Sequence, residues 1–189
     1  QGTGATALSS LITAMRIKGE RFSQQRYVIV GMGQAGSGIA GCIRALLREE
    51  GLSDKEACRL IYAVDQPGLL LEDSPGLEDQ QRPYAKSRED IAGWTLLNPG
   101  AITLHDVVAN AKASVLVGVT AKRGLFDDTL LRQMGKNSTR PVVLALSNPT
   151  SKTECTAEEA MTATDGRALM ATGSPFAPVS WKGREIHIS

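Results

Sequence analysis

The stretch YVIVGMGQAGSGIA, residues 27–40, decides the fold of this chain. It passes from a continuous apolar run, typical of a strand buried in a parallel sheet, through a glycine-rich turn into a helix. Gly31, Gly33 and Gly36 stand at G-x-G-x-x-G spacing. In that spacing the first glycine permits a tight turn, the second admits a pyrophosphate and the third lets helix and strand pack closely. Because the helix directs its unpaired N–H groups and positive dipole end at phosphates, the stretch predicts a dinucleotide site.

Outward from this stretch, apolar runs and amphipathic segments alternate along the chain. The segment 66–99, rich in Pro, Gly, Asp and Glu, is expected to be irregular and surface-exposed. Alternation of this kind requires a parallel sheet with right-handed crossovers. We therefore predict a Rossmann-like, doubly wound α/β domain, with helices on both faces of a mostly parallel sheet. The expected elements are helices over about 3–18, 34–50, 103–111, 127–134 and 156–162, a short helix capped by Ser53, and strands over 27–30, 60–64, 114–119, 142–146 and 168–171.

Size and composition limit the function. The 189 residues suit one domain, and 42% hydrophobic with 22% charged residues is ordinary for a globular protein. A formal net charge of +1 and 4% aromatic residues favour neither a nucleic-acid partner nor an anionic membrane. No apolar run approaches the roughly 20 residues of a spanning helix. Three cysteines without C-x-x-C pairing are typical of a reducing interior, so we expect a cytoplasmic protein, with an organelle matrix as the alternative.

Both ends of the sequence lie against predicted elements. The chain starts at Gln1 and leads directly into helical periodicity, and it ends at Ser189 in a predicted strand. We therefore expect residues 1–189 to be a single dinucleotide-binding domain excised from a longer protein.

Asp65, at the end of the second predicted strand, is the acid expected in such a site. It lies about 30 residues beyond the glycines rather than the commoner 20 or so, which the long helix and an insertion absorb. A carboxylate there accepts hydrogen bonds from ribose hydroxyls and repels a 2′-phosphate, which favours NAD. Arg82, Lys86 and Arg88 could fold back onto a 2′-phosphate, so NADP stays open. A plain capping role for Asp65 is the alternative.

Polar residues also follow the later strands. Val119 and Thr120 end the third strand, and Asn148 follows the fourth. Because ligands bind outside the carboxyl ends of parallel strands, we expect these tips to face the same crevice as Gly33. The Asn148 amide can donate to and accept from a ligand, although Asn-Pro is also a common turn start. The tip Gly173–Phe176 carries the same two interpretations.

Taken together, these motifs resemble the malic enzymes. The resemblance covers nearly the whole chain in order. The matching segments are QGT (1–3), GMGQAGSGIA (31–40), VDQPGLL (64–70), LVGVT (116–120), LSNPTS (146–151), ECTAE (154–158) and ATGSPF (171–176).

The resemblance implies oxidative decarboxylation of L-malate to pyruvate and carbon dioxide, with NAD or NADP reduced and Mg²⁺ or Mn²⁺ required. It also implies a homo-oligomer for the full-length enzyme. Asn148 matches a residue that contacts the substrate as well as the nicotinamide side. The positions that the resemblance assigns to the cofactor are Thr3, Gly31, Gly33, Gln34, Ala35, Gly36, Asp65, Gly118, Val119 and Asn148.

The chain also departs from the family's full pattern. Family members often have Glu where Gln34 stands, which does not affect a phosphate site made of backbone. The family's metal-binding acids and its catalytic Tyr and Lys lie ahead of the segment that begins at Gln1, and a second substrate-side Asn lies beyond Ser189. We therefore expect no catalytic and no metal-binding residue in this chain. By itself it should bind cofactor weakly and turn over no malate.

Three other functions stay open. A malolactic enzyme shares these motifs but keeps NAD bound and releases L-lactate. A non-catalytic nucleotide-binding module would bind NAD without an active partner domain. An S-adenosylmethionine-dependent methyltransferase also carries G-x-G ahead of an acid, although the third glycine and the LSNPT motif argue against it.

Overall fold

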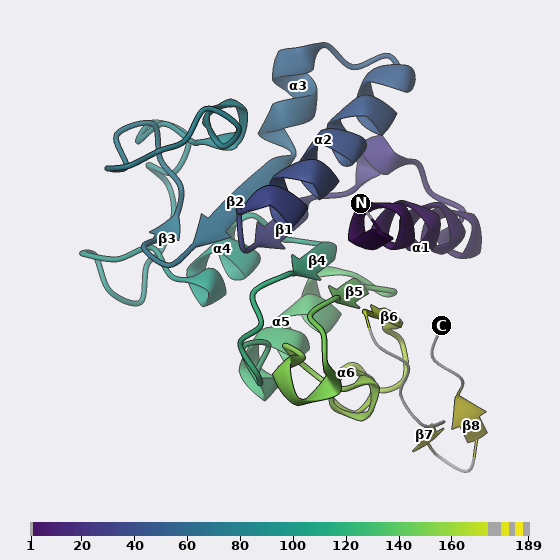
Figure 1. Cartoon of the computed structure of the whole chain (residues 1–189). Coiled ribbons are helices and arrows are strands. Elements are labelled where there is room, and N and C mark those ends of the chain that lie inside the picture. The colour runs from purple at the N-terminus through teal and green to yellow at the C-terminus, as the bar shows by residue number, and fades with distance from the viewer. Residues whose placement is uncertain (1, 174–178, 182–183, 187–189) are drawn as a thin grey trace.

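The computed structural model describes residues 2–173, 179–181 and 184–186. Its centre is a six-stranded sheet of order β3-β2-β1-β4-β5-β6 (Figure 1). All neighbouring pairs run parallel except β2 and β3, which are antiparallel. The predicted mostly parallel α/β sheet is confirmed. The strands of this sheet are β1 (Tyr27–Val30), β2 (Ile61–Asp65), β3 (Gly68–Leu69), β4 (Val115–Gly118), β5 (Val142–Ala145) and β6 (Leu169–Thr172).

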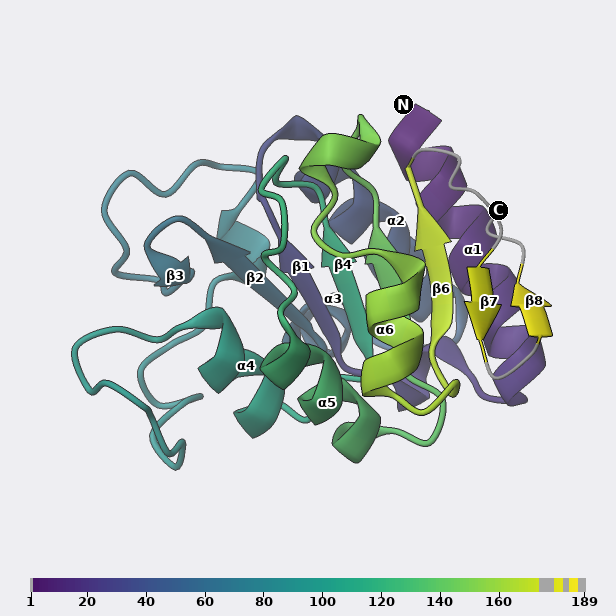
Figure 2. The ribbon, with the colours of Figure 1, turned by 90° about the horizontal axis from the view of Figure 1, so that it is seen from below.

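Helices cover both faces of the sheet, as Figures 1 and 2 show. α1, α2 and α3 supply residues to the apolar cluster on one face, and α4, α5 and α6 supply residues to the cluster on the other. The helices are α1 (Gly2–Lys18), α2 (Gln34–Glu49), α3 (Asp54–Arg59), α4 (Leu104–Asn110), α5 (Asp128–Asn137) and α6 (Ala157–Ala163), with 3-10 turns η1 (Phe22–Gln24), η2 (Arg82–Tyr84) and η3 (Thr150–Lys152).

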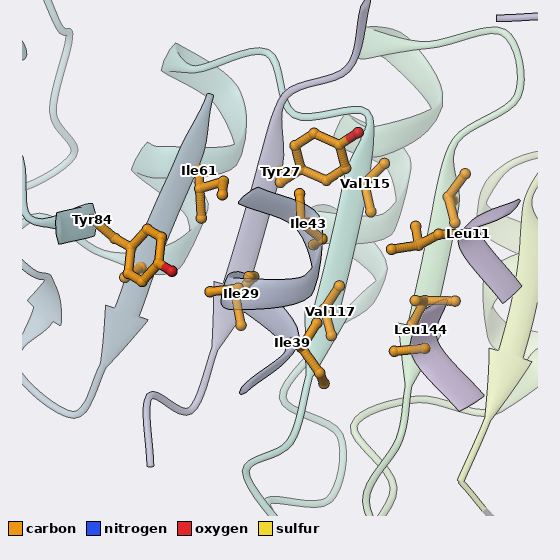
Figure 3. Packing of buried hydrophobic residues seen from close by; sticks show 14 of the residues in the cluster. Leu11, Tyr27, Ile29, Ile39, Ile43, Ile61, Tyr84, Val115, Val117 and Leu144 are labelled. Atoms are coloured by element: carbon orange, nitrogen blue, oxygen red, sulfur yellow. The ribbon is translucent and has the colours of Figure 1, made fainter. Parts of the chain in front are cut away.

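The continuous apolar runs of the strands reflect burial on both faces. Val28 belongs to the cluster beneath α4 and α5, whereas its neighbour Ile29 belongs to the cluster beneath α2. Figure 3 shows Ile29 of β1 beneath Ile39 and Ile43 of α2. Because successive side chains of a strand point to opposite faces, a strand covered on both sides needs an apolar residue at every position.

Capping side chains set the starts of three short helices. The Ser53 hydroxyl accepts from the Glu56 N–H at 3.1 Å, and the Glu56 carboxylate accepts from the Ser53 N–H at 2.8 Å. This reciprocal capping box confirms the predicted start of α3. Thr103 and Thr156 begin α4 and α6 in the same way. The helix predicted to end at residue 134 continues to Asn137, whose amide donates to the carbonyl oxygens of Val108 in α4 and Ala113 between α4 and β4.

The prediction of an irregular, exposed segment 66–99 holds only in part, because turns make up most of it but it contains β3 and several buried side chains. Gly68 has a φ of +101°, which reverses the chain so that β3 pairs antiparallel with the end of β2. Polar turn residues surround buried ones in this segment, so its composition conceals its packing. The buried apolar side chains here are Leu69, Leu70, Leu71, Tyr84 and Ile91.

The last described elements form a separate two-stranded antiparallel sheet of β7 (Val179–Trp181) and β8 (Arg184–Ile186). The strand expected at the end of the sequence is present in β8, and residues 187–189 lie outside the described residues. Among the helices that the structure describes, none combines the length and hydropathy needed to cross a membrane.

Candidate functional site

A cleft of about 560 Å³ opens where β1, β2 and β4 end. β1 lies between β2 and β4, so the cleft occupies the point at which the strand order reverses, the usual ligand position in open α/β sheets. Four segments form its walls. They contribute Val30–Gly33 after β1, Val64–Gly68 after β2, Ala101–Leu104 ahead of α4, and Val119, Thr120, Lys122 and Leu125 after β4.

The glycine turn forms the floor of this cleft. Gly31 has a φ of +95°, and a Cβ there would lie 2.7 Å from the Val119 carbonyl oxygen. A Cβ on Gly36 would overlap the Gly31 carbonyl oxygen, so helix and strand touch through backbone. A Cβ on Gly33 would meet no heavy atom within 4 Å apart from its chain neighbours and its own helix backbone, so its side of the turn is open. The close contacts at Gly31 and Gly36 fit the turn and packing roles that the spacing predicts, and the open side at Gly33 leaves room for a ligand.

The start of α2 lies directly after the turn. Gly33 is the N-cap residue, and its carbonyl accepts from the Ser37 N–H at 3.0 Å. The N–H groups of Gln34, Ala35 and Gly36 have no acceptor within the helix, because these are its first residues. Gln34 and Ala35 are exposed, whereas Gly36 is buried under the turn. The arrangement presents backbone donors and a positive helix end to an anion, which fits a pyrophosphate.

Asp65 lines the cleft and also fastens the glycine turn. Its Oδ2 accepts from the Met32 N–H at 3.2 Å, and its Oδ1 accepts from the Gln66 N–H at 2.9 Å. A carboxylate offers about four lone-pair positions, so capacity remains for ribose hydroxyls. The two roles weighed for this residue, capping and ligand binding, are therefore compatible in one geometry.

The three basic residues that could have folded back onto a 2′-phosphate do not line the cleft. Arg82 pairs with Asp79, and Arg88 with Asp73, each at 3.2 Å. Lys86 is buried beside β2, where its ammonium donates to three carbonyl oxygens. Their positions follow from the folding of segment 66–99, which the sequence pattern does not reveal.

The remaining predicted site residues do not line the cleft. Gly118 lies behind the wall, because a Cβ there would meet Phe126 and Glu154. Asn148 is exposed in the loop after β5. Thr3 lies in the first turn of α1, which begins on the side of the sheet where β6 ends (Figure 2). Gly173 is described, whereas Ser174–Phe176 of the predicted tip lie outside the described residues.

A buried carboxylate behind the cleft was missed from the sequence. Glu154 is 0% exposed, and its Oε2 accepts from the Thr120 N–H at 2.7 Å, the Thr120 hydroxyl at 2.8 Å and the Ser147 hydroxyl at 2.5 Å. The cleft-lining cation Lys122 was also missed. The signal for Glu154 was its place at the head of the ECTAE motif, but that motif does not reveal its partners, which are remote in sequence.

Metal-binding side chains do not gather in the part of the chain that the structure describes. Within it, no three His, Cys, Asp or Glu residues are grouped closely enough to hold a metal ion. The three cysteines are free, with Cys58 and Cys155 buried.

The fold and the cleft together define a dinucleotide-binding α/β domain. The family model "Malic enzyme, NAD binding domain" matches residues 1–189. The chain belongs to this family.

Known proteins agree with this assignment. The chain is 48% identical over 189 residues to an NAD-dependent malic enzyme of Pseudomonas savastanoi pv. phaseolicola and 44% identical to one of Erwinia tasmaniensis. All of this chain is covered, but it spans only 34% and 33% of those relatives. A malic enzyme of Pyrococcus horikoshii, with a TM-score of 0.69, and an NAD-dependent malic enzyme of Thermotoga maritima, with 0.67, share the fold. Each is 23% identical, with 94% of this chain and 37% or 41% of theirs aligned.

Proposed function

We propose that this chain is the NAD-binding domain of a malic enzyme that oxidatively decarboxylates L-malate to pyruvate and carbon dioxide while reducing NAD. The observation that carries the proposal is the alignment of all 189 residues with relatives named NAD-dependent malic enzyme, at up to 48% identity. The domain comprises residues 1–189, and the metal ligands and acid–base residues belong to the rest of the enzyme. We place the full-length protein in the cytoplasm as a homo-oligomer.

The residues of the cleft divide the work of binding. The N–H groups at the start of α2 hold the pyrophosphate, and Gly33 lets it approach the backbone. The Asp65 carboxylate accepts from the adenosine ribose hydroxyls. Val119 and Thr120 border the nicotinamide half, and the Asn148 amide contacts the substrate. Bound NAD supplies the hydride acceptor, and Mg²⁺ or Mn²⁺ supplies the Lewis acid that polarises the carbonyl.

The charge of Asp65 supports NAD rather than NADP as the substrate. A carboxylate at the ribose position repels a 2′-phosphate, and Arg82, Lys86 and Arg88 are held away from the cleft. Replacing Asp65 by Asn should weaken NAD binding about tenfold, which corresponds to roughly 1.4 kcal/mol, and should narrow the preference for NAD over NADP. Calorimetric titration of the wild-type and variant domains with both nucleotides measures this. Asp73→Asn, an exposed carboxylate paired with Arg88, is the control and should leave both affinities unchanged. Equal wild-type affinity for NAD and NADP would contradict the assignment.

The activity is tested with the full-length enzyme. With Mg²⁺ or Mn²⁺ and L-malate, we expect NADH and pyruvate to form in equal amounts. Lactate without net NADH identifies a malolactic enzyme instead, and NAD binding without turnover identifies a non-catalytic module. The isolated chain should bind NAD weakly and form no pyruvate, since it supplies no acid–base residue of the reaction. Metal-dependent pyruvate formation by residues 1–189 alone would overturn that division of roles.

A further inference from the structure

We infer that Glu154 is a positioning residue, which joins the cleft wall after β4 to the loop that carries Asn148 and so fixes the substrate side of the site. The inference rests on the proposed function, because Asn148 is a substrate contact only in a malate-oxidising enzyme. Glu154 itself touches neither NAD nor malate in this proposal. It acts through Thr120 and Ser147.

The side-chain hydrogen bonds of Glu154 converge on one oxygen atom. Its Oε2 accepts three, from the N–H and hydroxyl of Thr120 and from the hydroxyl of Ser147. Thr120 lines the cleft, and Ser147 directly precedes Asn148. One buried carboxylate therefore links a wall of the cleft to the loop proposed to contact substrate.

Each hydroxyl in this network also accepts a backbone donor. The Ser147 Oγ gives its proton to Glu154 and accepts from the Ala121 N–H at 2.8 Å. The Thr120 Oγ1 likewise gives its proton to Glu154 and accepts from the Lys122 N–H at 3.1 Å. Because each hydroxyl donates once and accepts once, its orientation is fixed. The loop 119–122 thus has a single hydrogen-bonded arrangement, with Glu154 at its centre.

The environment of the other carboxylate oxygen of Glu154 favours a positioning role over a purely stabilising one. Oε1 is buried, and it has no hydrogen-bond partner among the described residues. Leaving such an oxygen unpaired costs stability, which a residue selected for stability alone would avoid. Gly118 leaves the space that the side chain needs, since a Cβ there would lie 2.8 Å from the Glu154 carboxyl carbon.

Backbone hydrogen bonds hold the same loops together without the Glu154 side chain. The Phe126 N–H donates to the Glu154 carbonyl at 3.0 Å, and the Gly124 N–H donates to the Thr153 carbonyl at 3.1 Å. A variant of the Glu154 side chain should therefore fold, with the change confined to the network around Thr120 and Ser147.

The experiment compares Glu154→Ala and Glu154→Gln with wild type in the full-length enzyme. In Glu154→Ala we expect kcat/KM for malate to fall by about tenfold to a hundredfold, the usual effect of displaced substrate-positioning groups. The affinity for NAD should fall less than kcat/KM for malate, because the start of α2 and Asp65, which hold the pyrophosphate and ribose, make no hydrogen bond to Glu154, and only the nicotinamide end borders the loop 119–122. Glu154→Gln keeps an acceptor oxygen of the same reach and should recover part of the loss.

Hydrogen exchange supplies a readout that needs no activity. The Thr120, Ala121 and Lys122 amides are the backbone donors of the network, so they should exchange faster in Glu154→Ala, while the amides of β1 stay protected. Glu50→Ala is the matched control, since the Glu50 carboxylate likewise accepts from backbone, here from the N–H groups of Phe22 and Ser23, each at 2.9 Å. It should speed exchange near η1 and leave malate kinetics unchanged.

Two results would overturn the inference. One is unchanged exchange at Thr120 and Ala121 in Glu154→Ala. The other is an equal loss for NAD and malate, which a general structural defect produces. A wild-type enzyme that does not oxidise malate contradicts the proposed function instead, and the exchange of Thr120 and Ala121 then still decides whether Glu154 orders this wall.

Discussion

The absence of a side chain at Gly36 allows α2 to pack directly against the glycine turn. The position of Gly36 under the Gly31 carbonyl lets α2 start at the cleft, with its backbone donors directed outward. Any side chain there would push the helix off β1 and move those donors away from the phosphate position. Close backbone contact therefore gives the strand and helix the geometry of sites that bind anions.

Replacing Gly36 by Ala tests this contact. The added methyl group overlaps backbone that cannot move without breaking β1, so the free energy of unfolding should fall by about 1–3 kcal/mol. NAD affinity should fall at least about tenfold as the donors shift. Thermal denaturation and NAD titration of the domain measure both effects.

Gly41, five residues further along α2, is the control for that substitution. A Cβ there meets nothing within 4 Å, and alanine is the better helix former. Gly41→Ala should therefore raise the free energy of unfolding by about 0.5–1 kcal/mol and leave NAD binding unchanged. If Gly36→Ala behaves like Gly41→Ala, the close approach of α2 to β1 has no role in binding.

The residue scale also shows where sequence reasoning succeeds and stops. The positions of Gly31, Gly36 and Asp65 could be predicted because they depend on spacing within one strand–turn–helix unit and on the end of the next strand. Glu154 could not, because its partner Thr120 is 34 positions away and only the folded sheet brings the two together. Local patterns predict local geometry, and long-range contacts need the tertiary structure.

At the scale of elements, Lys86 anchors the long segment between β3 and α4. Its ammonium donates to the carbonyl oxygens of Cys58, Ile61 and Tyr84, at 3.0, 2.5 and 3.2 Å, and lies 4.7 Å from the centre of the Tyr62 ring. The segment is therefore held against β2 by one buried cation. A solvated loop was predicted here from the Pro, Gly, Asp and Glu content of the segment, and that content does not reveal a buried lysine.

The charge of Lys86 makes this anchor sensitive to pH. Burial lowers the pKa of Lys86 from its usual 10.5 to about 8. Between these values the unfolded chain binds more protons than the native one, so the Lys86 contribution to stability rises as the pH increases from about 8 to about 10.5. Relative to Lys86→Met, which does not titrate, the wild type should gain on the order of 1–3 kcal/mol over that range. Urea unfolding of both proteins at several pH values measures the difference. If the stability of the wild type relative to Lys86→Met falls as the pH rises, the hydrogen bonds to the three carbonyl oxygens outweigh burial in setting the pKa of Lys86.

Elements with regular patterns were predicted well and the irregular one was not. The strands and helices of the parallel sheet lie within about three residues of their predicted limits, because continuous apolar runs and capping residues mark them. β3 has only two residues, Gly68–Leu69, and owes its existence to pairing with β2. A strand that short carries no periodicity of its own.

Considered as a whole, the molecule has two apolar layers separated by one sheet, and α1 belongs to the first. Leu11 of α1 is 1% exposed and packs in the cluster that includes Ile29 and Leu144, which Figure 3 shows. A helix ahead of the first strand is thus a full part of the domain rather than an appendage.

Leu11→Ala tests whether α1 unfolds together with the sheet. The substitution should lower the free energy of unfolding by about 2–5 kcal/mol, because it leaves a cavity in the core. Ile17→Ala, at a residue of the same helix that is 54% exposed, should change it by less than about 0.5 kcal/mol. Urea unfolding followed by circular dichroism and by tryptophan fluorescence gives the values. A separate early transition with an unchanged main midpoint would show that α1 is not part of the cooperative unit.

The strand order has a consequence for how the protein is made. Tyr27 of β1 pairs with Ile61 on one side and with Val115 on the other. One edge of β1 therefore stays unpaired until β4, far downstream in the sequence, has been synthesised. On the ribosome, a nascent chain that has released β1, α2 and β2 still exposes that edge, which is a template for aggregation. The cleft is complete only after Val119 and Thr120 have been synthesised. NAD therefore cannot stabilise the nascent chain at earlier stages. It stabilises the domain only once β4 has joined β1, by binding the folded state alone.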